Sequence, residues 1–232
     1  MLCPQSLGMP NEVVIDDDRF GQGIDGGGLA EYSQLFGLHE MLLCGDVVAG
    51  DLFLFQYRKF ISTQIGGVES ASPWVRVLEP DSAPGLFPLQ DQLDAFSGRL
   101  AVGSVFEFGE SISSNYALVH VVDDFVLFVA ACAESGAVSN ADIKAFATLR
   151  GIIPSPSVCC IHVDVFIKLM DILKRVWNIY ALNYQIRRDG YQRRASGYLL
   201  ERLHSYLLCK WLMDNTEPNI QLWQRYVVTD AT

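Results

Sequence analysis

The most informative stretch of the chain is Tyr191-Gln192-Arg193-Arg194-Ala195-Ser196-Gly197-Tyr198-Leu199-Leu200-Glu201-Arg202-Leu203. Apolar residues continue beyond it at helical spacing, which predicts a helix from about residue 194 to 213. Within that helix, Arg194, Tyr198 and Glu201 are three or four residues apart and lie on adjoining faces. Gly197 has no side chain, so another backbone or a ligand could approach closely. The stretch therefore predicts a helix that carries side chains suited to catalysis or ligand binding.

The basic residues of the chain gather around this stretch. The 232 residues carry a formal net charge of -10, yet residues 174–210 contain eight basic and two acidic side chains, a local charge of +6 that leaves -16 elsewhere. The overall acidity argues against general nucleic-acid binding. RNA binding by the basic helix is kept as a minor alternative. One region of an acidic protein is thus predicted to meet negative charge.

Composition indicates a compact chain that forms one domain. Half of the residues are apolar and 19% are charged, which is enough apolar material for a substantial core. No transmembrane segment is predicted, because the best candidate, residues 117–133, is interrupted by His120, Asp123 and Asp124. The start of the chain lacks the pattern of a secretory signal, so a cytoplasmic location is expected. The six cysteines include no CxxC pair and are expected to be reduced.

Predicted strands and helices alternate along the chain. The expected strands are residues 12–16, 51–55, 99–106 and 158–161, and the expected helices are residues 29–43, 116–133, 139–151, 163–182 and 194–213. This order favours an α/β fold with a mostly parallel sheet flanked by helices and a helical C-terminal part. The single domain divides into a strand-helix-strand part (1–62), a proline-rich surface excursion (63–98), an α/β and helical part (99–213) and a C-terminal tail (214–232).

An acidic triplet follows the first predicted strand. Asp16 and Asp18 stand where carboxylates could hold Mg²⁺ or Mn²⁺ together with a diphosphate. A solvated acidic turn is the alternative interpretation. The glycines at 21–28 lack the order of a dinucleotide fingerprint or a P-loop, so neither site is predicted.

Four polar residues follow the second predicted strand, namely Gln56, Tyr57, Arg58 and Lys59. Ligands of open α/β sheets bind outside strand ends, which makes this position a candidate binding site. The guanidinium of Arg58 and the ammonium of Lys59 would suit a phosphate or a sugar hydroxyl. Ordinary solvated charge at a strand exit is an equally open interpretation.

The histidines and serines show no motif of metal or triad chemistry. His120, His162 and His204 lack the HExxH spacing, and a lone histidine is more often structural than catalytic. The chain also lacks a GxSxG elbow, so hydrolysis by a catalytic triad has no support.

Three segments, in order, resemble a family of bacterial capsule and exopolysaccharide glycosyltransferases that is related to the GT-A nucleotide-sugar fold. Residues 32–38 resemble the family's Tyr-Cys-Glu-Leu-Thr-Gly-Leu helix, with Gln34 in place of Glu. Residues 55–60 resemble its strand ending in His-Tyr-Arg-Arg-Tyr, with Gln56 in place of His. Residues 191–203 resemble its Tyr-Gln-x-Arg-x-x-Gly-Phe-x-x-Glu-Arg-Leu helix.

The resemblance implies transfer of a sugar from a nucleotide-sugar to a glycan or lipid-linked acceptor in surface polysaccharide synthesis. Glu201 is the candidate catalytic base, although it could instead hold an arginine in place. Candidates for binding the donor or acceptor are Gln56, Tyr57, Arg58, Lys59, Tyr191, Arg193, Arg194 and Arg202. A lipid-linked acceptor would further imply peripheral association with the inner face of a membrane. Because Gln34 and Gln56 depart from the family pattern, a catalytically inactive carbohydrate- or protein-binding relative is the alternative.

Overall fold

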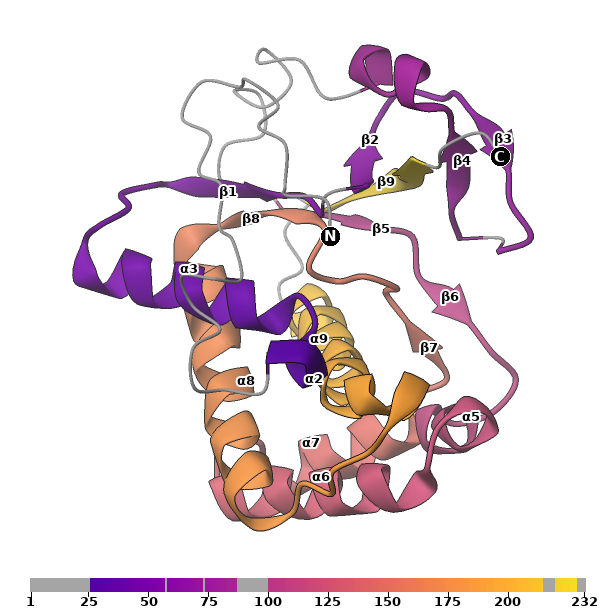
Figure 1. The fold of residues 1–232 in the computed structure, drawn as a ribbon. Coiled ribbons are helices and arrows are strands. Elements are labelled where there is room, and N and C mark those ends of the chain that lie inside the picture. The colour runs from indigo at the N-terminus through magenta and orange to yellow at the C-terminus, as the bar shows by residue number, and fades with distance from the viewer. Residues whose placement is uncertain (1–25, 57, 73, 87–99, 215–219, 229–232) are drawn as a thin grey trace.

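The computed structural model describes residues 26–56, 58–72, 74–86, 100–214 and 220–228. A seven-stranded sheet runs across the molecule, and helices α3, α8 and α9 lie together on one side of it (Figure 1). Helices α5, α6 and α7 lie farther from the sheet, beyond α8 and α9 (Figure 1). The predicted strand at residues 12–16 and both candidate metal ligands, Asp16 and Asp18, fall outside the described residues.

The seven-stranded sheet is mixed and mostly antiparallel, so the prediction of a mostly parallel sheet is wrong. The order is β1-β8-β5-β9-β4-β3, and β2 also pairs with β9. Only the β5–β9 and β4–β9 pairs are parallel. The strands are β1 (Asp51–Leu54), β2 (Lys59–Ser62), β3 (Val68–Glu69), β4 (Arg76–Leu78), β5 (Leu100–Gly103), β8 (Cys159–His162) and β9 (Ile220–Val228).

Strand β9 explains much of this difference. Its first half pairs with β5 and its second half pairs with both β2 and β4, so it joins two halves of the sheet. The prediction of a C-terminal tail at residues 214–232 is wrong for residues 220–228, which form β9. The partners of β9 lie more than 100 residues away along the chain, so no local pattern indicates the pairing.

The proline-rich excursion is also more ordered than predicted. Within residues 63–98, strands β3 and β4 belong to the main sheet, and two short 3-10 helices follow them, η1 (Pro80–Ser82) and η2 (Pro84–Leu86). The predicted strand at 99–106 is β5 together with a separate strand, β6 (Phe106–Glu107). Strand β6 pairs with β7 (Gly151–Ile152) in a two-stranded sheet.

The helical periodicity predicted most helices correctly. The structure contains α2 (Gly26–Leu29), α3 (Tyr32–Cys44), α7 (Asn140–Thr148), α8 (Val163–Asn183) and α9 (Ala195–Asp214). Gly45 ends α3 in the left-handed conformation with a φ of 77°. The Ser139 side chain caps α7 by accepting a hydrogen bond from the Asp142 backbone N–H at 3.1 Å.

The helix predicted at residues 116–133 is two helices, α5 (Ile112–Val119) and α6 (Val122–Ser135). The chain becomes extended at His120 and Val121. Asp123 and Asp124 then occupy the first turn of α6, where negative charge favours a new helix start. Continuous apolar residues on both sides of the break hid it from the periodicity.

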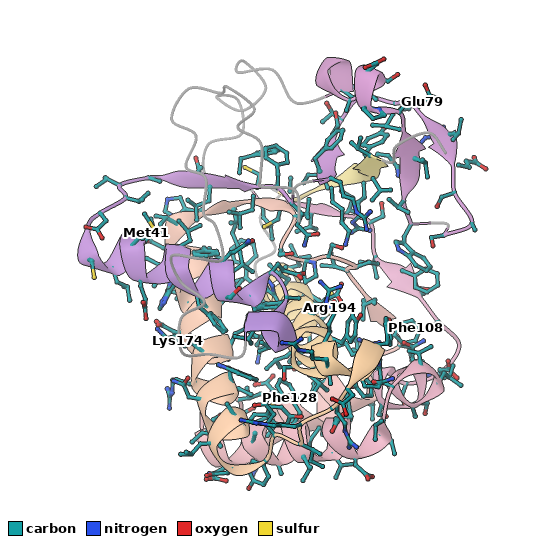
Figure 2. All side chains as sticks on the ribbon, viewed as in Figure 1. Met41, Glu79, Phe108, Phe128, Lys174 and Arg194 are labelled. Carbon is teal, nitrogen blue, oxygen red and sulfur yellow. The ribbon has the colours of Figure 1, made fainter. Side chains whose placement is uncertain are left out.

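The main core lies between the sheet and the helices and contains apolar residues from Leu29 to Leu208. Phe128 on α6 is fully buried and lies 5.4 Å from the ring of Tyr180 on α8, which ties the outer helix layer to the inner one (Figure 2). The cysteines among the described residues, all except Cys3, are free, as predicted. In the described part of the chain, no helix is long and apolar enough to cross a membrane.

A buried arginine supports the middle of the sheet. Arg225 on β9 is 2% exposed, and its Nη1 donates to the backbone oxygen of Trp74 at 3.1 Å. Burial lowers the pKa of the guanidinium to about 10. A Cβ added to Gly103 on the paired strand β5 would lie 1.9 Å from Nη2 of this side chain. Glycine at position 103 therefore makes room for the guanidinium.

Candidate functional site

A hydrogen-bonded polar cluster lies where β1 ends and β8 begins. The β1–β2 turn brings Gln56 and Lys59 into a backbone pair with hydrogen bonds of 3.0 and 3.1 Å. Residues directly opposite each other in an antiparallel pair project to the same face, so both side chains point into the cluster. Arg58 in the same turn is exposed, and Tyr57 falls outside the described residues. Position at a strand end, predicted from the sequence, thus brings Gln56 and Lys59 into one site.

Glu31, at the start of α3, is at the centre of this cluster. Its Oε1 accepts hydrogen bonds from Gln56 Nε2 at 3.1 Å and from the Ser157 hydroxyl at 3.3 Å. Gln56 Nε2 also donates to Ser157 Oγ at 2.9 Å. Two side chains from separate parts of the chain, Gln56 and Ser157, therefore fix the position of the Glu31 carboxyl group.

Glu201 on α9 binds the other side of the same loop. Its Oε1 accepts a hydrogen bond from the Ser155 backbone N–H at 2.8 Å, and Lys59 Nζ donates to Ser155 Oγ at 3.1 Å. The loop before β8 thus connects the two carboxylates, since Ser155 contacts Glu201 and Ser157 contacts Glu31. The structure thus brings Glu201, from the 191–203 stretch, and Lys59, from the strand-end motif, onto the same loop.

The electrostatics of the cluster perturb Glu31. Burial raises the pKa of its carboxyl above the ordinary value, and the charge of Glu201 raises it further, while Lys59 and Ser157 act in the opposite direction. The phenol of Tyr32 is fully buried beside Glu31, and burial raises its pKa well above the usual range. The raised pKa shifts the Glu31 carboxyl toward its protonated form relative to an exposed glutamate.

The backbone around the cluster is strained at two positions. Ala30 and Ser155 have φ angles of 51° and 49°, in the left-handed region that residues other than glycine rarely adopt. Such conformations cost on the order of 1–3 kcal/mol and concentrate at functional sites. A Cβ added to Gly197 on α9 would lie 3.1 Å from both Ala30 Cβ and Leu29 O, so this glycine permits the close backbone approach that the sequence predicted.

Of the remaining arginines predicted for the site, Arg202 is buried, whereas Arg193 and Arg194 are exposed. Arg202 is 7% exposed, its Nη1 donates to the Tyr198 backbone oxygen at 3.1 Å, and its guanidinium lies 4.9 Å from the Tyr116 ring centre. Burial lowers its pKa, an effect that Glu201 opposes. Arg193 and Arg194 are exposed in the 3-10 helix η3 (Gly190–Arg194) that precedes α9.

The basic segment lines a surface groove of about 890 Å³ between the end of α8 and the start of α9. Arg187, Arg188 and Arg193 are among its lining residues. Arg188 is partly neutralised, because it forms an ion pair at 3.1 Å with Asp124, whose side chain is fully buried. The excess positive charge predicted from the sequence therefore meets solvent at this groove.

Sequence reasoning missed Glu31, Ser155 and Ser157. Glu31 stands alone between a glycine run and an apolar helix, and no nearby residue forms a motif with it. The two serines alternate with Pro154 and Pro156 directly before a buried strand, and that polar loop at a strand boundary was the available signal. Among the described residues, no group of three acidic, histidine or cysteine side chains could hold a metal ion.

Comparisons with known proteins support the fold. No protein-family model matches the chain, and no curated protein matches it in sequence. The apo structure of WbbM, a bifunctional glycosyltransferase, is similar to 89% of the chain with a TM-score of 0.71 and 14% sequence identity. The chain spans 38% of the length of that protein. The likeness shows that this chain has the fold of part of a known glycosyltransferase.

Proposed function

We propose that the chain is a glycosyltransferase that moves a sugar from a nucleotide-sugar to a hydroxyl group of a glycan or lipid-linked acceptor. The observation that carries this proposal is the Glu31 and Glu201 pair, held through one loop at a strand end of a glycosyltransferase-like fold. Sites of α/β folds lie at strand ends, and acceptor activation needs a carboxylate able to take a proton.

In the proposed reaction, the acceptor oxygen forms a bond to the anomeric carbon of the donor. The bond from that carbon to the phosphate oxygen breaks, and the nucleoside diphosphate leaves with the electron pair. The acceptor hydroxyl proton passes to Glu201 as the base, and Glu31 is the second carboxyl group, held across the same loop.

The developing negative charge on the diphosphate needs cations. Lys59 reaches the cluster itself, and we propose that Arg58, Arg193 and Arg194 contribute from the exposed segments around it. We propose Mg²⁺ or Mn²⁺ at Asp16 and Asp18 on the basis of the sequence alone. The proposed partners are a nucleotide-sugar and a glycan or lipid-linked acceptor.

The alternative is a carbohydrate-binding relative without transferase activity. Gln56 favours it, because an amide that donates to Glu31 and Ser157 cannot exchange a proton as the family's histidine could. This alternative shares the fold and the ligand class but predicts no release of nucleoside diphosphate.

Release of nucleoside diphosphate from a panel of nucleotide-sugars, with Mn²⁺ present, tests the proposal. We expect release by the wild-type chain and a loss of about 100-fold or more in Glu201→Gln, the usual effect of removing a general base. Glu31→Gln keeps an acceptor oxygen for Gln56 and Ser157 and should lose less release than Glu201→Gln, because Glu31 is not the proposed base. Glu69→Gln is the matched control, since that side chain is 91% exposed and far from the cluster in the sheet.

Calorimetric titration of the same nucleotide-sugars, with and without Mn²⁺, distinguishes the transferase from the non-catalytic alternative. Binding without release would support the non-catalytic alternative. Neither binding nor release under any condition would overturn the transferase proposal.

A further inference from the structure

Three aromatic rings from separate elements stack beside the carboxylate cluster. His120 lies between α5 and α6, Tyr191 lies in η3 and Tyr198 lies in the first turn of α9. The rings of His120 and Tyr191 are nearly parallel at 5°, with centres 5.7 Å apart. The centres of His120 and Tyr198 are 4.4 Å apart, and those of Tyr191 and Tyr198 are 5.4 Å apart. We call these three residues the aromatic platform.

One ring of the platform is exposed to solvent, and a second ring is buried and held in place. Tyr191 is 62% exposed, whereas His120 is 9% exposed. The His120 ring nitrogen Nδ1 is 3.3 Å from Gln192 Oε1, and Gln192 Nε2 donates to the Val119 backbone oxygen at 3.0 Å. Burial, and then the positive charge of Arg202, lower the pKa of His120, so the imidazole is neutral near pH 7 and its Nδ1–H donates to Gln192.

The neighbours of the platform define what can bind there. An aromatic face carries partial negative charge and attracts either a cation or the weakly positive C–H groups on the face of a sugar ring. Arg193 and Arg194 precede α9 in the same 3-10 helix as Tyr191, and their positive charge opposes a cationic ligand. The tyrosine hydroxyls and the guanidinium groups are instead suited to the hydroxyls around a sugar ring.

The platform also leads toward the proposed reaction centre. Tyr198 and Glu201 are three residues apart on α9, so they are neighbours on the helix surface. The electrostatic influence of both Tyr191 and Glu201 on the Tyr198 phenol, whose pKa rises to about 12 mainly through burial, is consistent with this proximity. The segment before α9 reaches the end of α5 through the hydrogen bond from Gln192 to the Val119 backbone oxygen, and it also packs against α2.

We propose that the aromatic platform of His120, Tyr191 and Tyr198 is a carbohydrate subsite on which a pyranose ring of the glycan acceptor stacks. The role of the bound glycan as an acceptor rests on the proposed function, whereas binding of a sugar to the platform requires no catalysis. The tyrosine rings contact the C–H face of the sugar, and the sugar hydroxyls bind polar groups of the protein around the platform. One end of the bound glycan then points along α9 toward Glu201.

Saturation-transfer NMR on the whole chain with maltotetraose, mannotetraose and cellotetraose tests the subsite. We expect at least one of these neutral oligosaccharides to bind, and Tyr191→Ala to weaken its binding about tenfold or more. Tyr191→Phe keeps the stacking face and loses one hydroxyl, so its binding should weaken less than that of Tyr191→Ala. Leu182→Ala is the control, because Leu182 is an 81% exposed apolar residue at the end of α8. Thermal melts of each variant establish that the fold is retained.

The outcomes separate this inference from the proposed function. If none of the three oligosaccharides binds, or if Tyr191→Ala binds as tightly as wild type, the subsite assignment is wrong. If Tyr191→Ala instead weakens binding of uridine or guanosine diphosphate but of no oligosaccharide, the platform holds a nucleobase and the assignment is also wrong. Sugar binding that depends on Tyr191, in a chain that releases no nucleoside diphosphate, supports the subsite and removes the transferase proposal.

Discussion

His204 on α9 offers a direct test of how the structure around the candidate site responds to pH. The imidazole is 1% exposed, and its Nδ1 lies 3.2 Å from the Tyr32 hydroxyl. Burial lowers the pKa of His204 to about 3, against 6.5 for an exposed histidine. As the pH falls below 6.5, the unfolded chain binds a proton at this position and the folded chain does not. The folded state therefore loses stability on acidification.

The magnitude follows from the pH interval. From pH 6.5 to 5 the unfolded chain gains one proton over 1.5 pH units, which is worth about 2 kcal/mol at roughly 1.4 kcal/mol per unit. Urea unfolding of wild type and His204→Gln, followed by tryptophan fluorescence at pH 7 and pH 5, measures it. Glutamine keeps a hydrogen-bonding group for Tyr32 but does not titrate. We expect the stability advantage of wild type over the variant to shrink by about 2 kcal/mol on acidification.

The comparison between the two proteins isolates His204. The lowered pKa of His120 and the raised pKa of Glu31 act alike in wild type and variant, so their effects cancel. An equal stability difference at the two pH values would refute the reasoning. That result would mean that the folded chain protonates His204 as readily as the unfolded chain does.

Three further substitutions test the packing that supports the site. Gly103→Ala should lower the free energy of unfolding by about 1–3 kcal/mol, because its Cβ would lie 1.9 Å from Arg225 Nη2; an unchanged urea midpoint would contradict this. Asp124→Asn removes the charged partner of Arg188 and should cost about 1–2 kcal/mol in the same unfolding transition, because the remaining guanidinium is 25% exposed and can be hydrated; a loss below about 0.5 kcal/mol would show that the ion pair contributes little. Ser111→Ala removes the cap of α5 and should cost about 1 kcal/mol in a thermal melt, whereas Ser111→Asp should retain most of the stability.

Most helices could be predicted because their signals are local. Helix α8 was predicted at residues 163–182 and observed at Val163–Asn183, since its buried residues recur at helical spacing. Gly45 ends α3 through its left-handed backbone, and Ser139 caps α7 through its side chain, so both helix boundaries are set locally. The break at His120 was missed because apolar residues resume directly after it, at Val121 and Val122.

The sheet could be predicted only in part. Strands β1 and β8 were recognised from their apolar runs, but the alternation of strands and helices wrongly suggested parallel pairing. Strand β9 was placed in a tail, although it pairs with three other strands. Strand partners are chosen by side-chain packing over long separations, which no local pattern contains.

The residues of the candidate site, like the strands of the sheet, could be predicted only in part. Gln56 and Lys59 could be selected because they follow a buried strand, and Glu201 because it lies in a charged helical motif. Glu31 and Ser157 could not, since the hydrogen bond that joins them spans 126 residues. The aromatic platform likewise forms only because the segment before α9 folds back onto the break at His120.

The sequence by itself determined the helices, the chain's acidity, the basic segment at residues 174–210 and the stretch from Tyr191 to Leu203 that joins fold and site. The tertiary structure decided which strands pair, where β9 inserts, and that Glu31 faces Glu201 across one loop. Periodicity and capping act over a few residues, so they can be recognised in one dimension. Burial that raises a carboxyl pKa, and stacking between rings of distant segments, depend on the three-dimensional packing of the whole chain.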